Sequence, residues 1–113
     1  MKLIFLAILG GLPLATATTV YQVSNQSALS AALNSVSDGD TVELTANITL
    51  TSTMIIHNDI TLQSLEGNKF FLDGDNNVRI LSINSKNNVD INNIVFQNVR
   101  PFNSIILFVF MQN

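Results

Sequence analysis

The chain has 113 residues, enough for one small domain, and only 12% of them are charged. The formal net charge is −3 and no basic cluster occurs, which excludes electrostatic binding to nucleic acid or to anionic lipid. Cysteine is absent, so neither a disulfide framework nor a cysteine-based metal site can form.

The first 17 residues have the three parts of a secretory signal peptide. Lys2 supplies the positive start, Leu3–Leu14 is an apolar run, and Ala15-Thr16-Ala17 is a cleavage sequence. The apolar run is shorter than the roughly 20 residues that a membrane-spanning helix needs. We therefore expect cleavage before Thr18 and a secreted or cell-surface protein without an integral membrane span, rather than an uncleaved anchor or a buried strand.

Residues 18–40 are expected to form a strand followed by a capping helix. Val20–Val23 alternates as a short strand does. Asn25 or Ser27 can accept hydrogen bonds from the free amides of a first helical turn, so either is a candidate N-cap. Asp38-Gly39-Asp40 is expected to end the helix, because glycine tolerates a positive φ. Between these signals the apolar residues fall at helical spacing, namely Ala28, Leu29, Ala32, Leu33 and Val36.

The pattern of residues 41–100 predicts short strands separated by Asn-rich and Asp-rich corners. The clearest stretch is Asn87–Val99, where two alternating strands are joined at Asn92-Asn93. The strongest turn signal is Asp73–Asn77. The other expected strands are Thr41–Leu44, Asn47–Leu50, Met54–Ile56, Ile60–Gln63, Phe70–Leu72 and Val78–Ile83.

A weak internal similarity suggests that these strands stack. Asn58–Leu62 matches Asn88–Ile91 loosely, which favours repeated units that cannot bury their apolar faces alone. We expect successive passes of the chain to pair as parallel strands around an apolar interior. The predicted core is Leu29, Leu33, Val42, Leu44, Ile60, Leu62, Ile80, Ile83, Val89, Ile91, Ile94 and Phe96.

The apolar helix residues Leu29, Ala32 and Leu33 are followed by three strand segments, Gly39–Leu44, Ile60–Leu62 and Val89–Asn98. Together these segments resemble the N-terminal end of right-handed parallel β-helix proteins of the pectin-lyase-like superfamily. That family begins with a strand and a capping helix, followed by a Gly-Asp-Thr-Val-x-Leu strand. The resemblance implies an all-β fold: a short right-handed parallel β-helix (a solenoid) with one N-terminal capping helix and with coils over residues 41–100.

The chain is much shorter than members of that family, which run to many coils. We therefore expect a truncated member or a fragment of a longer protein, with residues 101–113 as an apolar tail or a truncated last coil. An open last coil would expose apolar side chains and unpaired strand edges. End-to-end self-association through that end is a further expectation.

Two features of the sequence are candidates for a metal-binding or catalytic site. Asp73, Asp75 and Asn77 alternate like the first ligands of a calcium loop, but Val78 stands where such a loop needs glycine. A turn explains these residues better. His57 is the single histidine, and the sequence supplies no nucleophile or orienting partner for it. We predict no catalytic, cofactor-binding or metal-binding residue.

Two sequons for N-linked glycosylation occur, Asn25-Gln26-Ser27 and Asn47-Ile48-Thr49. In a eukaryotic host Asn25 and Asn47 are therefore candidate modification sites. A bacterial host would make both sequons irrelevant, and chance matches are common in a chain so rich in asparagine.

In its low charge and its abundance of asparagine, the chain is most similar to the non-enzymatic surface proteins of the family, such as polymorphic outer-membrane-protein-like repeats. We predict a secreted or cell-surface module that is not an enzyme and works by adhesion or by binding a carbohydrate or a surface protein. One alternative is the N-terminal fragment of a polysaccharide lyase or glycoside hydrolase whose catalytic coils are missing. Another is a truncated product without a function of its own.

Overall fold

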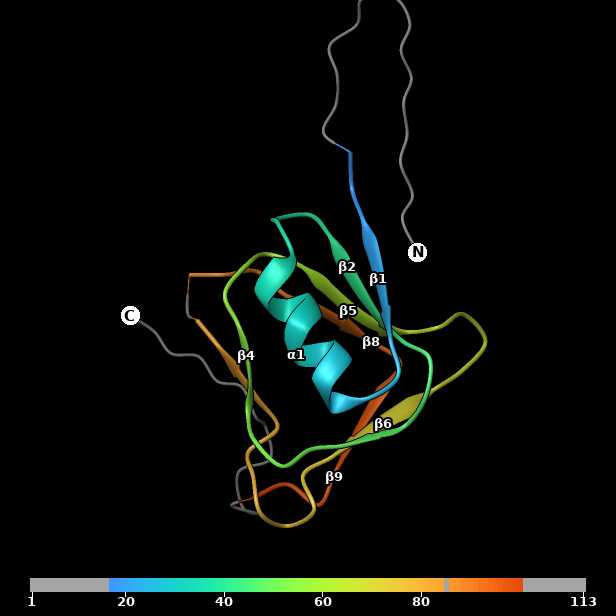
Figure 1. Ribbon diagram of the computed structural model, residues 1–113, viewed down its shortest axis with the longest axis vertical. Coiled ribbons are helices and arrows are strands. Elements are labelled where there is room, and N and C mark those ends of the chain that lie inside the picture. Colours follow the sequence, from blue (N-terminus) through green and yellow to red (C-terminus); the bar gives the residue numbers. More distant parts are fainter. Residues whose placement is uncertain (1–16, 85, 101–113) are drawn as a thin grey trace, which may run out of the picture.

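The computed structural model describes residues 17–84 and 86–100. The predicted signal peptide, except Ala17, and the predicted tail of residues 101–113 lie outside these ranges. Within them the chain forms one helix and nine short strands (Figure 1). No helix of this part is long and apolar enough to cross a membrane.

The elements are β1 (Val20–Val23), α1 (Gln26–Ser35), β2 (Thr41–Leu44), β3 (Ile48–Thr49), β4 (Met54–Ile56), β5 (Thr61–Ser64), β6 (Phe70–Asp73), β7 (Leu81–Ile83), β8 (Asp90–Asn92) and β9 (Ile94–Gln97).

The strands belong to three parallel sheets. The first sheet has the order β1-β2-β5-β8, the second β3-β6-β9, and the third β4-β7. In the first sheet Val42 pairs with Leu62, and Glu43 pairs with Gln63. Because successive side chains of a strand point to opposite faces, the first pair points into the core and the second points outward.

The predicted right-handed parallel β-helix is wrong. The structure has three small, separate parallel sheets of four, three and two strands, together with one α-helix. Helix α1 occupies the connection from β1 to β2, whereas the connection from β2 to β5 contains β3 and β4, so the first sheet has a strand, β1, for which the other two sheets have no counterpart. Leu29 and Leu33 of α1 are buried in the common core, so the helix is a core element as well as an end piece.

Helix α1 begins as predicted and ends earlier than predicted. Asn25 is the N-cap, and its side-chain oxygen accepts a hydrogen bond from the N–H of Ala28 at 2.8 Å. The helix ends at Ser35, because Val36 turns into extended backbone. Gly39 has a φ of 97° and its N–H donates to the Asp59 carbonyl, so it shapes the next corner rather than the helix end.

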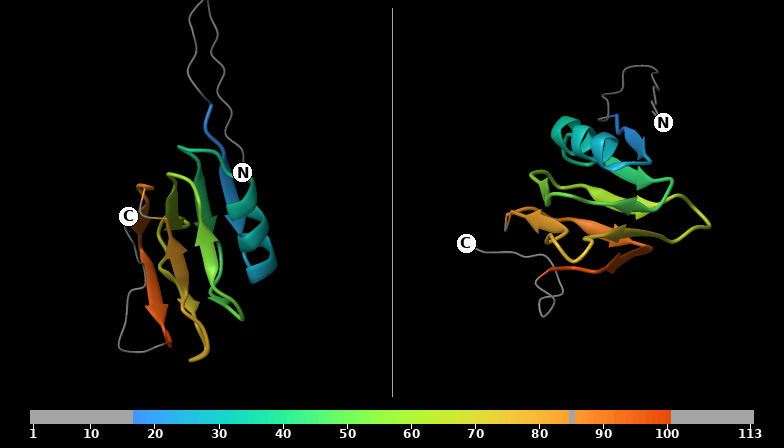
Figure 2. Two further views of the ribbon diagram at one scale, coloured as in Figure 1. Left: turned by 90° about the vertical axis from the view of Figure 1, so that its left-hand side faces the viewer. Right: turned by 60° about the horizontal axis from the view of Figure 1, so that its bottom comes forward.

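Most of the predicted core is confirmed. Eight of the twelve predicted residues are buried: Leu29, Leu33, Val42, Leu44, Ile60, Leu62, Ile80 and Ile83. Val89, Ile91, Ile94 and Phe96 are only partly buried and pack against that core. They lie on or beside β8 and β9, the last strands of their sheets, at the opposite end from α1 (Figure 2). Within the described residues each of these strands has a neighbour on one side only, which leaves its inward side chains half-covered.

Aspartates at the corners tie successive passes of the chain together. The carboxylate of Asp40, only 5% exposed, accepts hydrogen bonds from the N–H groups of Thr19 and Ser37. The carboxylate of Asp59 accepts the N–H of Asn88 at 2.8 Å. Within the described residues these three N–H groups donate to no backbone carbonyl, so the aspartate side chains satisfy amides that would otherwise lose hydrogen bonds on folding.

Gly74 is expected to be required at the corner that follows β6. A Cβ added there would lie 2.6 Å from the Val78 carbonyl oxygen and 2.8 Å from that of Asn98, and neither backbone atom can move cheaply. Gly74→Ala should lower the free energy of unfolding by about 1–3 kcal/mol, measured by urea denaturation. Asn76→Gly is the control, because glycine adopts the observed φ of 60° freely. Parent-like stability of Gly74→Ala would contradict the close backbone approach.

Candidate functional site

The outward face of the first sheet carries two aligned rows of mainly polar side chains. In-register parallel pairing repeats each row at the strand spacing of about 4.8 Å. Val20 is the one apolar member. All the others are exposed or half-buried, and we call them the polar sheet face: Gln22, Thr41, Glu43, Thr61, Gln63, Asp90 and Asn92.

Glu43 lies at the centre of the polar sheet face. The Nε2 group of Gln22 donates to Glu43 Oε1 at 2.8 Å, and the Nε2 group of Gln63 donates to Glu43 Oε2 at 3.1 Å. Each carboxylate oxygen therefore accepts one amide and keeps room for a second donor, while each amide nitrogen keeps a second N–H. Three strands thus hold a row of positioned donors and acceptors that face solvent.

The polar sheet face carries negative charge. Glu43 and Asp90 contribute carboxylates, and the set contains neither lysine nor arginine. An anionic ligand would meet like charges there, whereas a neutral ligand rich in hydroxyl groups would meet hydrogen-bonding partners.

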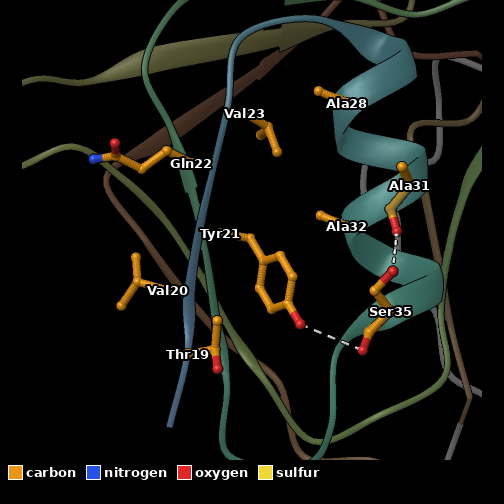
Figure 3. A pocket seen from close by; sticks show the side chains of 9 residues that line it. All are labelled: Thr19, Val20, Tyr21, Gln22, Val23, Ala28, Ala31, Ala32 and Ser35. Carbon is orange, nitrogen blue, oxygen red and sulfur yellow. Dashed lines mark hydrogen bonds between the residues drawn. The ribbon is translucent and has the colours of Figure 1, made fainter. Parts of the chain in front are cut away.

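A groove of about 560 Å³ runs along β1 beside α1. Tyr21 projects from β1 into the space in front of Ala32, and its hydroxyl donates a long hydrogen bond of 3.5 Å to the Ser35 carbonyl (Figure 3). Gln22 also lines this groove but points away from the helix, toward the polar sheet face (Figure 3). The groove therefore borders the polar sheet face and adds mainly small, apolar walls to it.

Asp73 stabilises the corner that was predicted from Asp73–Asn77. Its carboxylate accepts hydrogen bonds from Gln97 Nε2 at 2.9 Å, from Asn98 Nδ2 at 3.0 Å and from the N–H of Asp75 at 2.7 Å. The bond from Gln97 is the main cause that lowers the pKa of Asp73 below its ordinary value of 3.8. Burial opposes this effect, and the bonds from Asn98 and Asp75 add to it. The predicted turn is confirmed, and the Asp73 carboxylate stabilises it through hydrogen bonds within the fold.

His57 lies just after β4 and is exposed. It borders a small cavity of about 200 Å³, which Ser30, Asn34 and Ser52 also line. In the described ranges, no group of three or more His, Cys, Asp or Glu side chains is placed to hold a metal ion. The structure therefore brings His57 near serine and asparagine side chains but does not join it to Asp73 or to Glu43.

The polar sheet face was not predicted from the sequence. The alternation of each strand indicated which residues point outward, but aligning Gln22, Glu43 and Gln63 requires the pairing of strands about 20 residues apart. One signal was present, because β1, β2 and β5 each have a hydrophobic residue (Tyr, Val or Leu) followed directly by Gln or Glu.

Comparison with known proteins gave no relative: no family model matches the chain, and no curated protein or solved structure does so. The resemblance to the pectin-lyase-like superfamily therefore stays a prediction. Function has to be inferred from the geometry of the described residues.

Acidification is expected to weaken the Asp73 corner. A carboxylate whose pKa is lower in the folded chain stabilises the fold fully above its unfolded pKa, and loses that contribution as pH falls through the folded pKa. Asp73→Asn should therefore be less stable than the parent at neutral pH, and the difference should shrink below about pH 4. Urea denaturation at several pH values measures this difference.

Glu66→Gln is the control for the change in net charge, because Glu66 is an exposed carboxylate in a turn. A stability difference between Asp73→Asn and the parent that stays constant from neutral to acidic pH would show that the carboxylate charge does not stabilise this corner.

Proposed function

We propose that this chain is a non-enzymatic module, secreted or displayed at the cell surface, that binds a neutral carbohydrate through its polar sheet face. The observation that carries the proposal is the Gln22–Glu43–Gln63 row. Its amides and carboxylate are already held in place before a ligand arrives, so little side-chain freedom is lost on binding.

Hydrogen-bonding chemistry favours a carbohydrate. A sugar hydroxyl both donates and accepts, so it can donate to a Glu43 oxygen while it accepts from a neighbouring amide N–H. A linear polysaccharide repeats its hydroxyl groups along its length, as the two rows repeat theirs from strand to strand. Thr41 and Thr61 add hydroxyl groups of their own in the second row.

Charge favours a neutral sugar over an acidic one. Glu43 and Asp90 place two carboxylates on the polar sheet face, and no basic residue of that set offsets them. A polyuronate would have to bring further carboxylates against these, at a cost in affinity. The proposed ligand is therefore a neutral polysaccharide, not a pectin-like acid.

The composition of the face also favours a carbohydrate over a protein partner. Stable protein interfaces depend on a central apolar or aromatic anchor that becomes fully desolvated. Val20 is the only apolar side chain in the two outward rows, and it lies at the end of its row on β1.

Affinity electrophoresis of the full chain tests this function. Gels containing neutral linear glucan, xylan or mannan should retard the protein in at least one case, and polygalacturonate should not. Glu43→Ala should raise the dissociation constant obtained from the retardation by about 10-fold or more, because a hydrogen bond to a charged group contributes about 1.5–3 kcal/mol.

Glu66→Ala is the matched control, because it removes the same charge from an exposed turn and Glu66 is not a member of the polar sheet face. It should bind like the parent. The proposal fails if no neutral polysaccharide retards the chain, or if Glu43→Ala and Glu66→Ala bind equally well while circular dichroism shows both folded.

A further inference from the structure

We infer that Asn25 and Asn47 are both acceptor sites for N-linked glycans. Each begins a sequon, Asn25-Gln26-Ser27 and Asn47-Ile48-Thr49, and each asparagine side chain is exposed. Neither residue lies within a strand or within α1, since Asn25 precedes the helix and Asn47 precedes β3. This inference is independent of what the polar sheet face binds.

Asn25 and Asn47 each accept a backbone hydrogen bond through the side-chain oxygen. Oδ1 of Asn25 accepts the N–H of Ala28 at 2.8 Å, and Oδ1 of Asn47 accepts the N–H of Phe71 at 2.9 Å. Nδ2 of each residue, the atom that carries an N-linked glycan, donates no hydrogen bond within residues 17–84 and 86–100. The fold therefore depends on the carbonyl oxygen and leaves the amide nitrogen available.

Three asparagines at other corners use the amide nitrogen instead. The Nδ2 groups of Asn58, Asn87 and Asn98 donate to the carboxylates of corner aspartates. A glycan on one of these nitrogens would leave only one hydrogen for such a bond and would crowd the corner. The two sequon asparagines thus differ from these corner asparagines in the atom that the structure uses.

The chemistry of transfer preserves both structural hydrogen bonds. The oligosaccharide comes from a lipid-pyrophosphate donor: a bond forms between Nδ2 and the anomeric carbon, and the bond from that carbon to the pyrophosphate oxygen breaks. Nδ2 loses one proton, and the lipid pyrophosphate leaves with the electron pair. Oδ1 is unchanged, so the Asn25 cap and the Asn47–Phe71 bond can both persist in the glycosylated protein.

The hydroxyl-bearing third residue of each sequon is also exposed. Ser27 and Thr49 are exposed, whereas Ile48 is 2% exposed and anchors the second sequon to the core. The two glycans would lie near one corner of the molecule. The connections after β1 and β2 are joined there by a hydrogen bond from the Thr45 N–H to the Val23 carbonyl at 2.9 Å. The two glycans would therefore lie beyond the ends of β1 and β2, beside the polar sheet face.

Secretion of the full chain from a yeast or mammalian host, behind a secretion leader of that host, tests the inference. Intact mass before and after treatment with an N-glycosidase should show two occupied sites. Asn25→Asp and Asn47→Asp should each remove one glycan, and the double variant should remove both. A chain that the N-glycosidase does not change, or glycans that persist in the double variant, would overturn the inference; a single occupied site would overturn it for the other residue.

Asparagine-to-aspartate replacement keeps an acceptor oxygen at each position, so loss of the glycan is separated from loss of the fold. Aspartate is as good an N-cap as asparagine, and Asn25→Asp should therefore match the stability of the unglycosylated parent. Ser27→Ala and Thr49→Val provide a second route, because each destroys a sequon without changing the asparagine. Asn84→Asp, outside any sequon, also keeps an acceptor oxygen for the Lys86 N–H and should leave the glycan mass unchanged.

Discussion

The structure depends on parallel, in-register pairing between passes of the chain that are about 20 to 30 residues apart. That register places Val42 beside Leu62 in the core and Glu43 beside Gln63 on the outside. A slip of one residue in one strand would turn its apolar side chains to solvent and its polar ones to the core. Packing and the candidate binding surface are therefore fixed by the same alignment.

Glu43 and Asp73 show how similar acids serve different ends in this arrangement. Asp73 receives hydrogen bonds from two side chains and one backbone amide at a corner, and they lower its pKa. Glu43 receives one amide on each oxygen in the middle of an open sheet face. The Asp73 carboxylate therefore stabilises the fold, whereas each oxygen of the Glu43 carboxylate can accept a further hydrogen bond from a ligand.

Local structure was predictable from the sequence where alternation or capping determines it. The bounds of β1, β2 and β4 were predicted correctly, and Asn93, with a φ of 56°, forms the expected joint between β8 and β9. The end of α1 was mispredicted, because Gly39 serves a later corner. The arrangement of the sheets and the Glu43 row could not be predicted, because both depend on pairing between distant segments that local pattern does not determine.

The most direct test of this account is the register itself. The chain has no cysteine, so two cysteines introduced by mutation have no other thiol partner within the same molecule, and dilute protein keeps disulfides between molecules rare. Thr41→Cys with Thr61→Cys places two cysteines on adjacent strands with their Cα atoms about 4.8 Å apart, within disulfide range, whereas Thr41→Cys with Gln63→Cys places the Cα atoms about 8 Å apart. Mild oxidation should link the first pair quickly and the second pair slowly or not at all. Equal rates, or a faster second pair, would contradict the register and with it the alignment of the polar sheet face.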